Sequence, residues 1–308
     1  MKYIVGVDGG GTKTEAVVCD LNGNVVARKV IGSTNPNDVG NEKMLSSVCG
    51  LIESVLPFDC GSMDIGLGIS GIFTAGSEDK LLESLKERFR FIDKIKVVSD
   101  KDSALSSAYD GDGCIAVIGT GSVCVVRKNG NVRDFGGGGY LIDDALSGFD
   151  LGREVLHAVL CADDGIFGKT ILTELFNKKT GENIRKHLKY VYLKGKTYVA
   201  SFAPIVFSAL EENDEIAENI MRKSVCGFER LVSAVYSFWG KEQCEMTLFG
   251  GLAARFKTID RFLSEEIKKK VIFKFPEYPI IYGDIKYILS EGKKEFAENF
   301  IRSYSKIK

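Results

Sequence analysis

The stretch Asp8-Gly9-Gly10-Gly11-Thr12-Lys13-Thr14 separates two short apolar runs, 3–7 and 16–19, near the N-terminus. Short apolar runs bounded by turn residues are typical of buried strands, so the pattern predicts a strand, a glycine turn and a second strand. Three glycines after a strand let backbone N–H groups turn toward an anion with no Cβ in the way. Asp8 could hold Mg²⁺ directly or through water, and Lys13 or Thr12 could reach phosphate oxygens. The alternative is a plain hairpin turn, which rarely needs three glycines in this setting.

The order strand, glycine turn, strand, Asn-Gly turn recurs later, at 114–132. The second glycine turn is Gly119-Thr120-Gly121-Ser122, and the tetrapeptide Asn-Gly-Asn-Val occurs both at 22–25 and at 129–132. Asn-Gly is a strong signal for a type I′ hairpin. The repeated order predicts an internal duplication, with two glycine turns that face each other across a shared cleft.

Strand and helix patterns alternate through the rest of the chain, which is typical of parallel α/β units. Further strands are expected at 63–69, 94–98, 245–249 and 271–275. Helices are expected at 42–56, 78–89, 103–109, 149–161, 170–178, 196–211, 214–239 and 284–305. The turn residues at 110–113 suggest a boundary between an N-terminal domain, 1–112, and a C-terminal α/β domain with helical insertions, 113–287. A closing helix at 288–308 is expected to pack back on the first domain.

Charge and composition exclude several classes of protein. The 308 residues include 41 Lys+Arg and 42 Asp+Glu, so the formal net charge of −1 lacks the footprint of a nucleic-acid binder. No apolar stretch reaches the roughly 18 residues that span a bilayer, and the first apolar run soon meets Asp8, unlike a signal peptide. The eight cysteines contain no Cys-x-x-Cys pair. We therefore expect buried thiols in a cytoplasmic protein without membrane or nucleic-acid partners.

Ser99-Asp100 ends a predicted strand, where ligands gather in open α/β sheets. A carboxylate there could accept a proton from a substrate hydroxyl. The alternative is that Asp100 caps the following helix, and Asp102 competes for both roles.

Two further glycine-rich stretches are candidates for binding. Four glycines at 136–139 precede Tyr140, Asp143 and Asp144. They could form an adaptable wall in which Asp144 accepts hydrogen bonds from sugar hydroxyls, or merely a flexible connection. The stretch 248–254 reads strand, Gly250-Gly251, helix, which suits a flat ring, a phosphate or tight strand–helix packing.

Taken together, these motifs resemble the sugar-kinase/actin/heat-shock-protein ATPase superfamily. More narrowly, the chain resembles the N-acetylglucosamine kinase branch of the BadF/BadG/BcrA/BcrD ATPase family along nearly its whole length. The resemblance implies a duplicated ribonuclease-H-like α/β fold of the actin/hexokinase type, with two domains and an interdomain cleft. It identifies 8–14 and 119–122 with the phosphate motifs, 248–254 with the adenosine motif and Ser33-Thr34-Asn35 with the substrate loop. It also selects Asp100 over Asp102 as the catalytic aspartate.

The activity implied by this resemblance is ATP-dependent phosphorylation of the 6-hydroxyl of N-acetylglucosamine or a related sugar, such as N-acetylmuramic acid or glucosamine. Asp100 would be the general base, and Asp8 would hold Mg²⁺. The expected ATP-binding residues are Gly9, Gly10, Gly11, Thr12, Lys13, Thr120, Gly121, Gly250, Gly251 and Ala254. The expected sugar-binding residues are Ser33, Thr34, Asn35, Ser70, Gly71, Asp100, Ser122, Gly138, Gly139, Tyr140 and Asp144. The expected partners are the sugar and ATP, and a homodimer is left open.

The family pattern changes in one place. The family typically reads Gly-Gly-Trp-Gly and then Gly-Asp-Glu-Gly-Ser-Gly. Here Gly138 replaces the Trp and Ala145 replaces the Glu, while Asp144 keeps the substrate position. The loss of the indole predicts a roomier or differently shaped pocket. We hypothesise that it admits a bulkier sugar, such as N-acetylmuramic acid with its 3-O-lactyl group.

The same broad family contains a second activity, which is the alternative to an amino-sugar kinase. An ATPase activator of a radical acyl-CoA dehydratase or reductase needs clustered cysteines that hold an iron–sulfur cluster between two subunits. The scattered cysteines argue against it. A sugar-responsive regulator would need a DNA-binding element, and an actin-like protein would form filaments with ATP.

Overall fold

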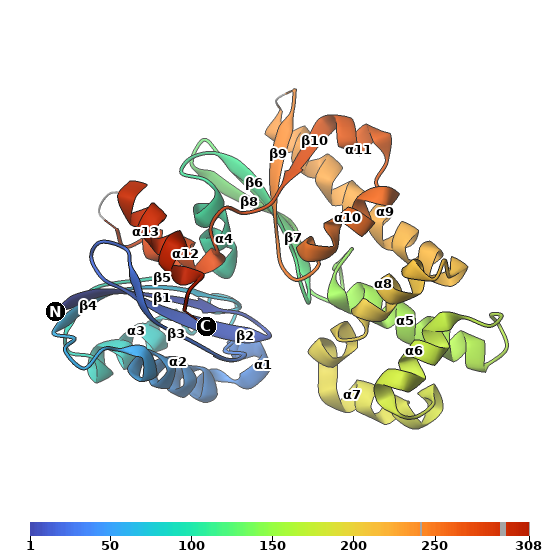
Figure 1. The fold of residues 1–308 in the computed structure, drawn as a ribbon, viewed down its shortest axis with the longest axis horizontal. Coiled ribbons are helices and arrows are strands. Elements are labelled where there is room, and N and C mark those ends of the chain that lie inside the picture. The colour runs from blue at the N-terminus through green and yellow to red at the C-terminus, as the bar shows by residue number, and fades with distance from the viewer. Residues whose placement is uncertain (241, 290–293, 308) are drawn as a thin grey trace. The chain divides into compact units, whose positions relative to one another are not determined.

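A computed structural model describes residues 1–240, 242–289 and 294–307 of the chain (Figure 1). The chain divides into two compact units: residues 1–110 together with the segment from Pro276 onward, and residues 111–275. The sequence-based division placed residues up to 287 in the second domain. The structure corrects this, because helix α12 (Ile280–Lys286) packs on strands β1 (Lys2–Gly9) and β4 (Ser62–Ile69) and on helix α4 (Asp100–Ala108).

Each unit is built on a five-stranded mixed sheet. The first sheet has the order β3-β2-β1-β4-β5, and the second has the order β10-β9-β6-β7-β8. The remaining strands are β2 (Lys13–Cys19), β3 (Val25–Gly32), β5 (Ile92–Val98), β6 (Gly113–Ile118), β7 (Ser122–Lys128), β8 (Asn131–Gly136), β9 (Cys244–Phe249) and β10 (Val271–Lys274). In both sheets the first three strands in sequence pair antiparallel and the last two join in parallel. The predicted duplication and the two-unit α/β fold are thus confirmed.

Helices cover both faces of the first sheet (Figure 1). Side chains alternate between the faces of a strand, so Val5 and Val7 pack in the core with α2 (Asn41–Val55) and α3 (Glu78–Arg88). Ile4, which precedes Val5 and points to the opposite face, packs against residues of α12 and α13 (Lys294–Tyr304). The expected closing helix, 284–305, is therefore two helices, although residues 290–293 lie outside the described part of the chain.

The second unit carries a larger set of helices. They are α5 (Gly148–Asp163), α6 (Ile171–Thr180), α7 (Ile184–Ala200), α8 (Ala203–Glu211), α9 (Glu215–Trp239), α10 (Phe256–Ile259) and α11 (Glu265–Lys270). The sequence pattern missed most of α7, whose interior breaks at Gly195 with φ +69°. The expected helix 196–211 is divided at Ser201, which ends α7. The helix expected from about 252 forms as the short helix α10 between 3₁₀ turns at Ala253–Arg255 and Asp260–Phe262.

The two Asn-Gly turns differ. Asn129 and Gly130 both have positive φ, +51° and +76°, as a type I′ turn requires. At Asn22-Gly23 the expectation is wrong, because five residues separate the strands. There, Asp20 Oδ1 accepts hydrogen bonds from the N–H groups of Asn22 and Asn24, each at 2.9 Å.

The cysteines form no disulfide. Six are buried, whereas Cys60 is half-buried and Cys226 is exposed. Within the described ranges, no helix combines the length and the apolar character that a membrane crossing requires.

Candidate functional site

Asp8 lies one residue from the end of β1, where the chain turns tightly into β2. The N–H of Gly10 donates to the carbonyl oxygen of Lys13 at 2.9 Å, which closes the turn. Burial, the charge of Asp100 and that of Glu15 raise the pKa of Asp8 to about 7, while the Lys13 charge lowers it. Asp8 and Asp100 therefore lie near enough to repel each other when both are ionised.

Space, and not backbone angle, requires a glycine at position 9 of this turn. None of Gly9, Gly10 and Gly11 has a positive φ. A Cβ at Gly9 would lie 2.7 Å from Thr34 Oγ1, so this glycine lets the loop at 33–35 approach β1. Ser33 Oγ donates to the carbonyl oxygen of Gly10 at 3.2 Å, on the same loop.

Thr34 is fully buried, with its hydroxyl 2.7 Å from that of Thr14. This hydrogen bond fixes the loop on β2. The sugar contact expected at Thr34 stays a prediction. Thr14 belongs to the first glycine motif, but the sequence analysis assigned it no role.

Asn35 on the loop after β3, Ser70 directly after β4 and Asp100 at the start of α4 come together. Asn35 Nδ2 donates to Ser70 Oγ at 3.5 Å, and a hydrogen bond from Ser70 to Asp100 counteracts the burial that raises the pKa of Asp100. The N–H of Ser70 donates to Gly9 O at 2.7 Å, which joins this cluster to the first glycine turn. Gly71 has φ +78°, and a Cβ there would lie 2.4 Å from Asn35 Oδ1. The structure thus gathers the predicted residues of the first unit at one edge of its sheet.

The N-terminus of α4 separates the roles of the two candidate aspartates. Ser99 is the N-cap: its Oγ accepts from the N–H of Asp102 at 3.1 Å and lies 2.7 Å from Asp102 Oδ2. Asp102 is therefore engaged in capping. Asp100 is the first helical residue, and its carboxyl is turned to Ser70 instead. The alternative in which Asp100 caps the helix is wrong.

The second glycine turn, between β6 and β7, is bound to the loop that carries Asp144. Asp144 Oδ1 accepts from the N–H of Ser122 at 3.0 Å, and Ser122 Oγ donates to Ala145 O at 2.7 Å. Gly121 allows this approach, since a Cβ there would lie 3.1 Å from the same carboxylate oxygen. Burial raises the pKa of Asp144, and the hydrogen bond from the Ser122 N–H counteracts this rise. Both donors of Ser122 are used internally, so Ser122 could meet a sugar only as an acceptor.

The adenosine motif packs against the same turn. Gly250 has φ +94°, and a Cβ there would lie 2.4 Å from Ile118 O. The N–H of Leu252 donates to that carbonyl oxygen at 3.0 Å. A Cβ on Gly251 would meet nothing within 4 Å, and Ala254 is exposed, so these two positions leave an open surface. Thr120 O accepts from the N–H of Phe149 at 3.0 Å, which brings the start of α5 to the turn.

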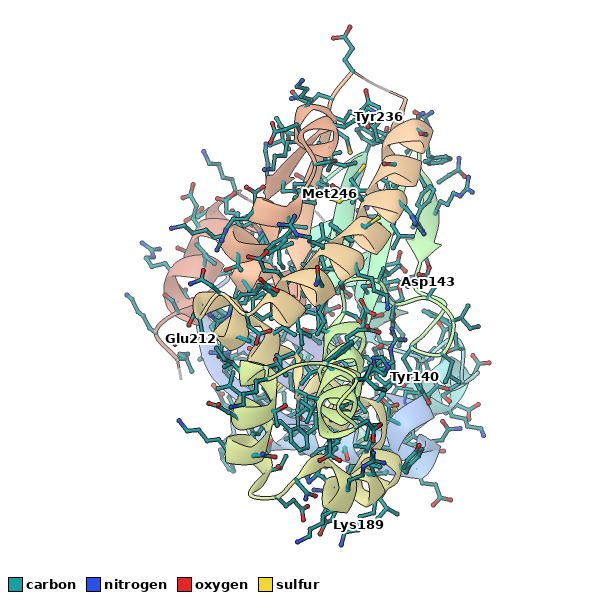
Figure 2. The ribbon with its side chains drawn as sticks, turned by 90° about the vertical axis from the view of Figure 1, so that its right-hand side faces the viewer. Tyr140, Asp143, Lys189, Glu212, Tyr236 and Met246 are labelled. Atoms are coloured by element: carbon teal, nitrogen blue, oxygen red, sulfur yellow. The ribbon has the colours of Figure 1, made fainter. Side chains whose placement is uncertain are left out.

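Tyr140 and Asp143 mark the loop after β8 (Figure 2). Gly136, Gly137 and Gly139 have positive φ, whereas Gly138 does not. Tyr140 packs on Phe149, with ring centroids 4.8 Å apart. A cavity of about 420 Å³ opens beside this loop, lined among others by Tyr140, Asp144, Ala145, Lys223 and Arg230. Residues 140–145 of this loop therefore line the cavity, just after Gly138, where the family pattern has its tryptophan.

Sequence reasoning missed Asp284, a buried carboxyl whose charge couples to those of Asp8 and Asp100. Asp284 on α12 is fully buried, and the charges of Asp8 and Asp100 add to the burial that raises its pKa well above the ordinary value. Its signal in the sequence was a lone acid in the apolar stretch 279–289. In the part of the chain that the structure describes, no three His, Cys, Asp or Glu side chains converge as a ready metal cage.

The comparisons with known proteins agree with this architecture. A protein named N-acetylmuramic acid/N-acetylglucosamine kinase from Clostridium acetobutylicum is 29% identical over 301 residues, which cover 91% of this chain and 94% of that protein. An N-acetyl-D-glucosamine kinase from Dictyostelium discoideum is 28% identical over 91% of this chain and 93% of its own length.

Solved structures show the same fold. A provisionally named N-acetylglucosamine kinase from Chromobacterium violaceum superposes with a TM-score of 0.80 at 23% identity, covering 94% of this chain and 99% of that one. A glucokinase from Streptomyces griseus, in complex with glucose and AMPPNP, superposes with a TM-score of 0.58 at 15% identity, covering 93% and 98%. The model of the BadF/BadG/BcrA/BcrD ATPase family matches residues 5–283. The chain therefore belongs to the BadF/BadG/BcrA/BcrD ATPase family.

Proposed function

We propose that this protein is an ATP-dependent amino-sugar kinase that phosphorylates N-acetylglucosamine or a close relative of it. The family is one of ATPases, and the relatives named above, with a glucosamine kinase from Vibrio cholerae at 26% identity, carry the names of amino-sugar kinases. The observation that carries the proposal is the cluster of Asn35, Ser70 and Asp100, in which one carboxylate stands beside hydroxyl and amide groups and is not the N-cap of its helix.

In the proposed reaction, Asp100 accepts the proton of the sugar 6-hydroxyl as that oxygen attacks the γ-phosphorus of ATP, and ADP leaves. Burial raises the pKa of Asp100 and makes it a better proton acceptor than an exposed aspartate. Ser70 and Asn35 orient the carboxylate and the sugar. Phosphoryl transfer depends mainly on the positioning of the reactants and on charge stabilisation. The protein therefore accelerates the reaction chiefly through these contacts.

Mg²⁺ fits the donors of the first unit. Magnesium binds through one or two carboxylates together with phosphate oxygens and water, and so needs no complete protein cage. Asp8 and Asp100 repel each other, a repulsion that a dication would relieve. We propose that Asp8 holds the ion, which when bound neutralises charge on the phosphates. The backbone of the turn at 9–11, Thr12 and Lys13 would contact the phosphates in the first unit. Thr120, Gly121 and the open surface at Gly251 and Ala254 would contact ATP in the second.

The sugar preference is proposed to extend to N-acetylmuramic acid. A Cβ at Gly138 would find its nearest neighbour, Ile142, at 3.5 Å, an ordinary contact, and Gly138 itself adds no side chain to this part of the loop. We propose that the cavity lined by Tyr140 and Asp144 accommodates a 3-O-lactyl group. We expect turnover of N-acetylmuramic acid; good turnover of N-acetylglucosamine with none of N-acetylmuramic acid would contradict this preference.

The test is ADP release with ATP and Mg²⁺ on a panel of N-acetylglucosamine, N-acetylmuramic acid, glucosamine, N-acetylmannosamine and glucose. Sugar-dependent release that Asp100→Asn abolishes supports the kinase, and mass spectrometry of the product locates the phosphate. ATP hydrolysis that no sugar stimulates, in a protein that binds iron, would point to the activator of a radical enzyme instead.

A further inference from the structure

Helix α12 carries a polar group into the interior of the first unit. Asp284 has no exposed surface, its Oδ1 accepts a hydrogen bond from Ser103 Oγ, and its Oδ2 has no hydrogen-bond partner. Burying a polar atom without a partner is unfavourable by about 1–3 kcal/mol. A leucine or alanine would avoid this cost, so the carboxyl needs an explanation other than packing.

Glycines make the space that brings Asp284 to its partner. A Cβ at Gly68 would lie 2.3 Å from Asp284 Oδ1, and one at Gly66 would lie 2.0 Å from the Asp284 carbonyl oxygen. A Cβ at Gly283 would lie 1.9 Å from Ser103 O. Both β4 and α12 therefore use glycine where α12 presses on β4 and α4, and the contact between Asp284 and Ser103 depends on this close approach.

The partner Ser103 belongs to the turn that presents Asp100. Ser103 lies one turn after Ser99, and its Oγ is also 3.1 Å from the Ser99 carbonyl oxygen. Ser99 in turn caps the helix through Asp102. The first turn of α4 is thus held at its capped end by Ser99 and from the interior by Asp284 through Ser103.

We propose that Asp284 is a positioning residue for the general base: through Ser103 it fixes the first turn of α4 and so the place of the Asp100 carboxylate. This inference rests on the proposed role of Asp100. The raised pKa of Asp284 means that a neutral group of the same shape is compatible with the site. Asn keeps an oxygen that can accept from Ser103, whereas Leu has similar bulk and accepts nothing.

The experiment compares Asp284→Asn and Asp284→Leu with a matched control on the same helix pair. Lys286 Nζ donates to Ser106 O at 2.6 Å, so Lys286→Met also removes one contact between α12 and α4, but further from Asp100. Steady-state kinetics with saturating ATP and a varied sugar, at a temperature below every melting transition, give kcat and KM. Because a misplacement of about 1 Å can cost ~100-fold in rate, we expect Asp284→Leu to lower kcat roughly 30-fold with KM for the sugar changed by less than about threefold.

The same reasoning predicts that Asp284→Asn and Lys286→Met keep kcat within about threefold of the unmodified protein, although each lowers the melting temperature. A kcat for Asp284→Leu near that of the control would overturn the inference, as would losses that merely follow the melting temperatures across all three variants. Where Asp284→Leu does not fold, Ser103→Ala removes the other half of the bond and should give the same selective loss of kcat. Asp100→Asn is measured alongside: if it retains turnover, the role of Asp100 fails, whereas if it alone loses turnover, only the role of Asp284 fails.

Discussion

The geometry at the start of α4 leads to a sharp contrast between two aspartates two residues apart. Asp102 exchanges hydrogen bonds with the N-cap Ser99, whereas Asp100 is hydrogen-bonded to Ser70. We therefore expect Asp100→Asn to remove turnover and leave stability nearly intact. We expect Asp102→Ala to lower stability and leave turnover nearly intact.

The size of each effect follows from these contacts. Loss of a general base removes about 10²–10⁴-fold in rate, so Asp100→Asn should reduce kcat by roughly 10³-fold. Its melting temperature should stay level or rise, because burial raises the pKa of Asp100 and makes its ionised form unfavourable. Asp102→Ala loses a hydrogen bond worth about 1 kcal/mol and a favourable charge at the helix N-terminus worth about 0.5 kcal/mol. At roughly 2–4 °C per kcal/mol for a domain of this size, the melting temperature should fall by about 3–6 °C.

The assay pairs ADP release with differential scanning fluorimetry on the same preparations. The kinetic comparison is made well below the lower melting temperature, so that both variants are folded. Equal losses of turnover in the two variants, or a stability loss confined to Asp100→Asn, would refute the assignment of base and cap. Asp102→Asn is the control for the charge alone, because its amide oxygen can still accept from Ser99.

Three further predictions concern the glycine turns and their acids. Gly250→Ala places a side chain at φ +94° and 2.4 Å from Ile118 O, so we expect a loss of more than about 2 kcal/mol in a urea melt; a loss below about 0.5 kcal/mol would contradict the close approach. Thr34→Val leaves the Thr14 hydroxyl without its partner, and we expect about 1–2 kcal/mol of destabilisation with an unchanged ranking of sugars; a changed ranking would mean that Thr34 touches the sugar. The pKa of Asp8 rises from 3.8 to about 7 on folding, so the folded state binds this proton more tightly, and the free energy of unfolding should fall as pH rises through this window. In Asp8→Asn, the free energy of unfolding from urea melts should differ less between about pH 5 and about pH 8 than in the unmodified protein. An unchanged difference would mean that other groups cause the pH dependence.

The sheets were predictable because their signals are local. Apolar runs such as 3–7 and 114–118, each followed by glycines, fixed the strands, and the repeated Asn-Gly-Asn-Val tied the halves together. The same order of strands in the two sheets follows from that repeat. What local patterns could not predict is the contact made across the fold. The packing of 280–286 on the first unit joins residues far apart in sequence. No local sequence pattern near Asp284 indicates that Ser103 is its hydrogen-bond partner.

The residues of the candidate site were predictable as types and positions, but their roles were not. The stretches 33–35 and 99–102 each contain several polar side chains, any of which could face a ligand. Both Thr34 and Asn35 are buried, but Thr34 is hydrogen-bonded to Thr14 and Asn35 to Ser70. A capping hydrogen bond likewise distinguishes Asp102 from Asp100. These distinctions depend on atoms brought together by folding, so spacing alone could not make them.

The two halves share a topology but place their acids differently at equivalent glycine turns. In the first half the acid, Asp8, belongs to the strand itself, and burial together with the charge of Asp100 raises its pKa to about 7. In the second half no acid ends the strand β6; Asp144 arrives from the loop after β8 and accepts the N–H of Ser122. A carboxylate that already has a donor gains less from a cation than one that faces another carboxylate. The duplication therefore gave rise to two glycine turns at equivalent places in the two sheets whose nearby acids differ in origin and in partner. Of the two acids, Asp8 is the one better suited to a divalent cation, whereas Asp144 is already held by the Ser122 N–H.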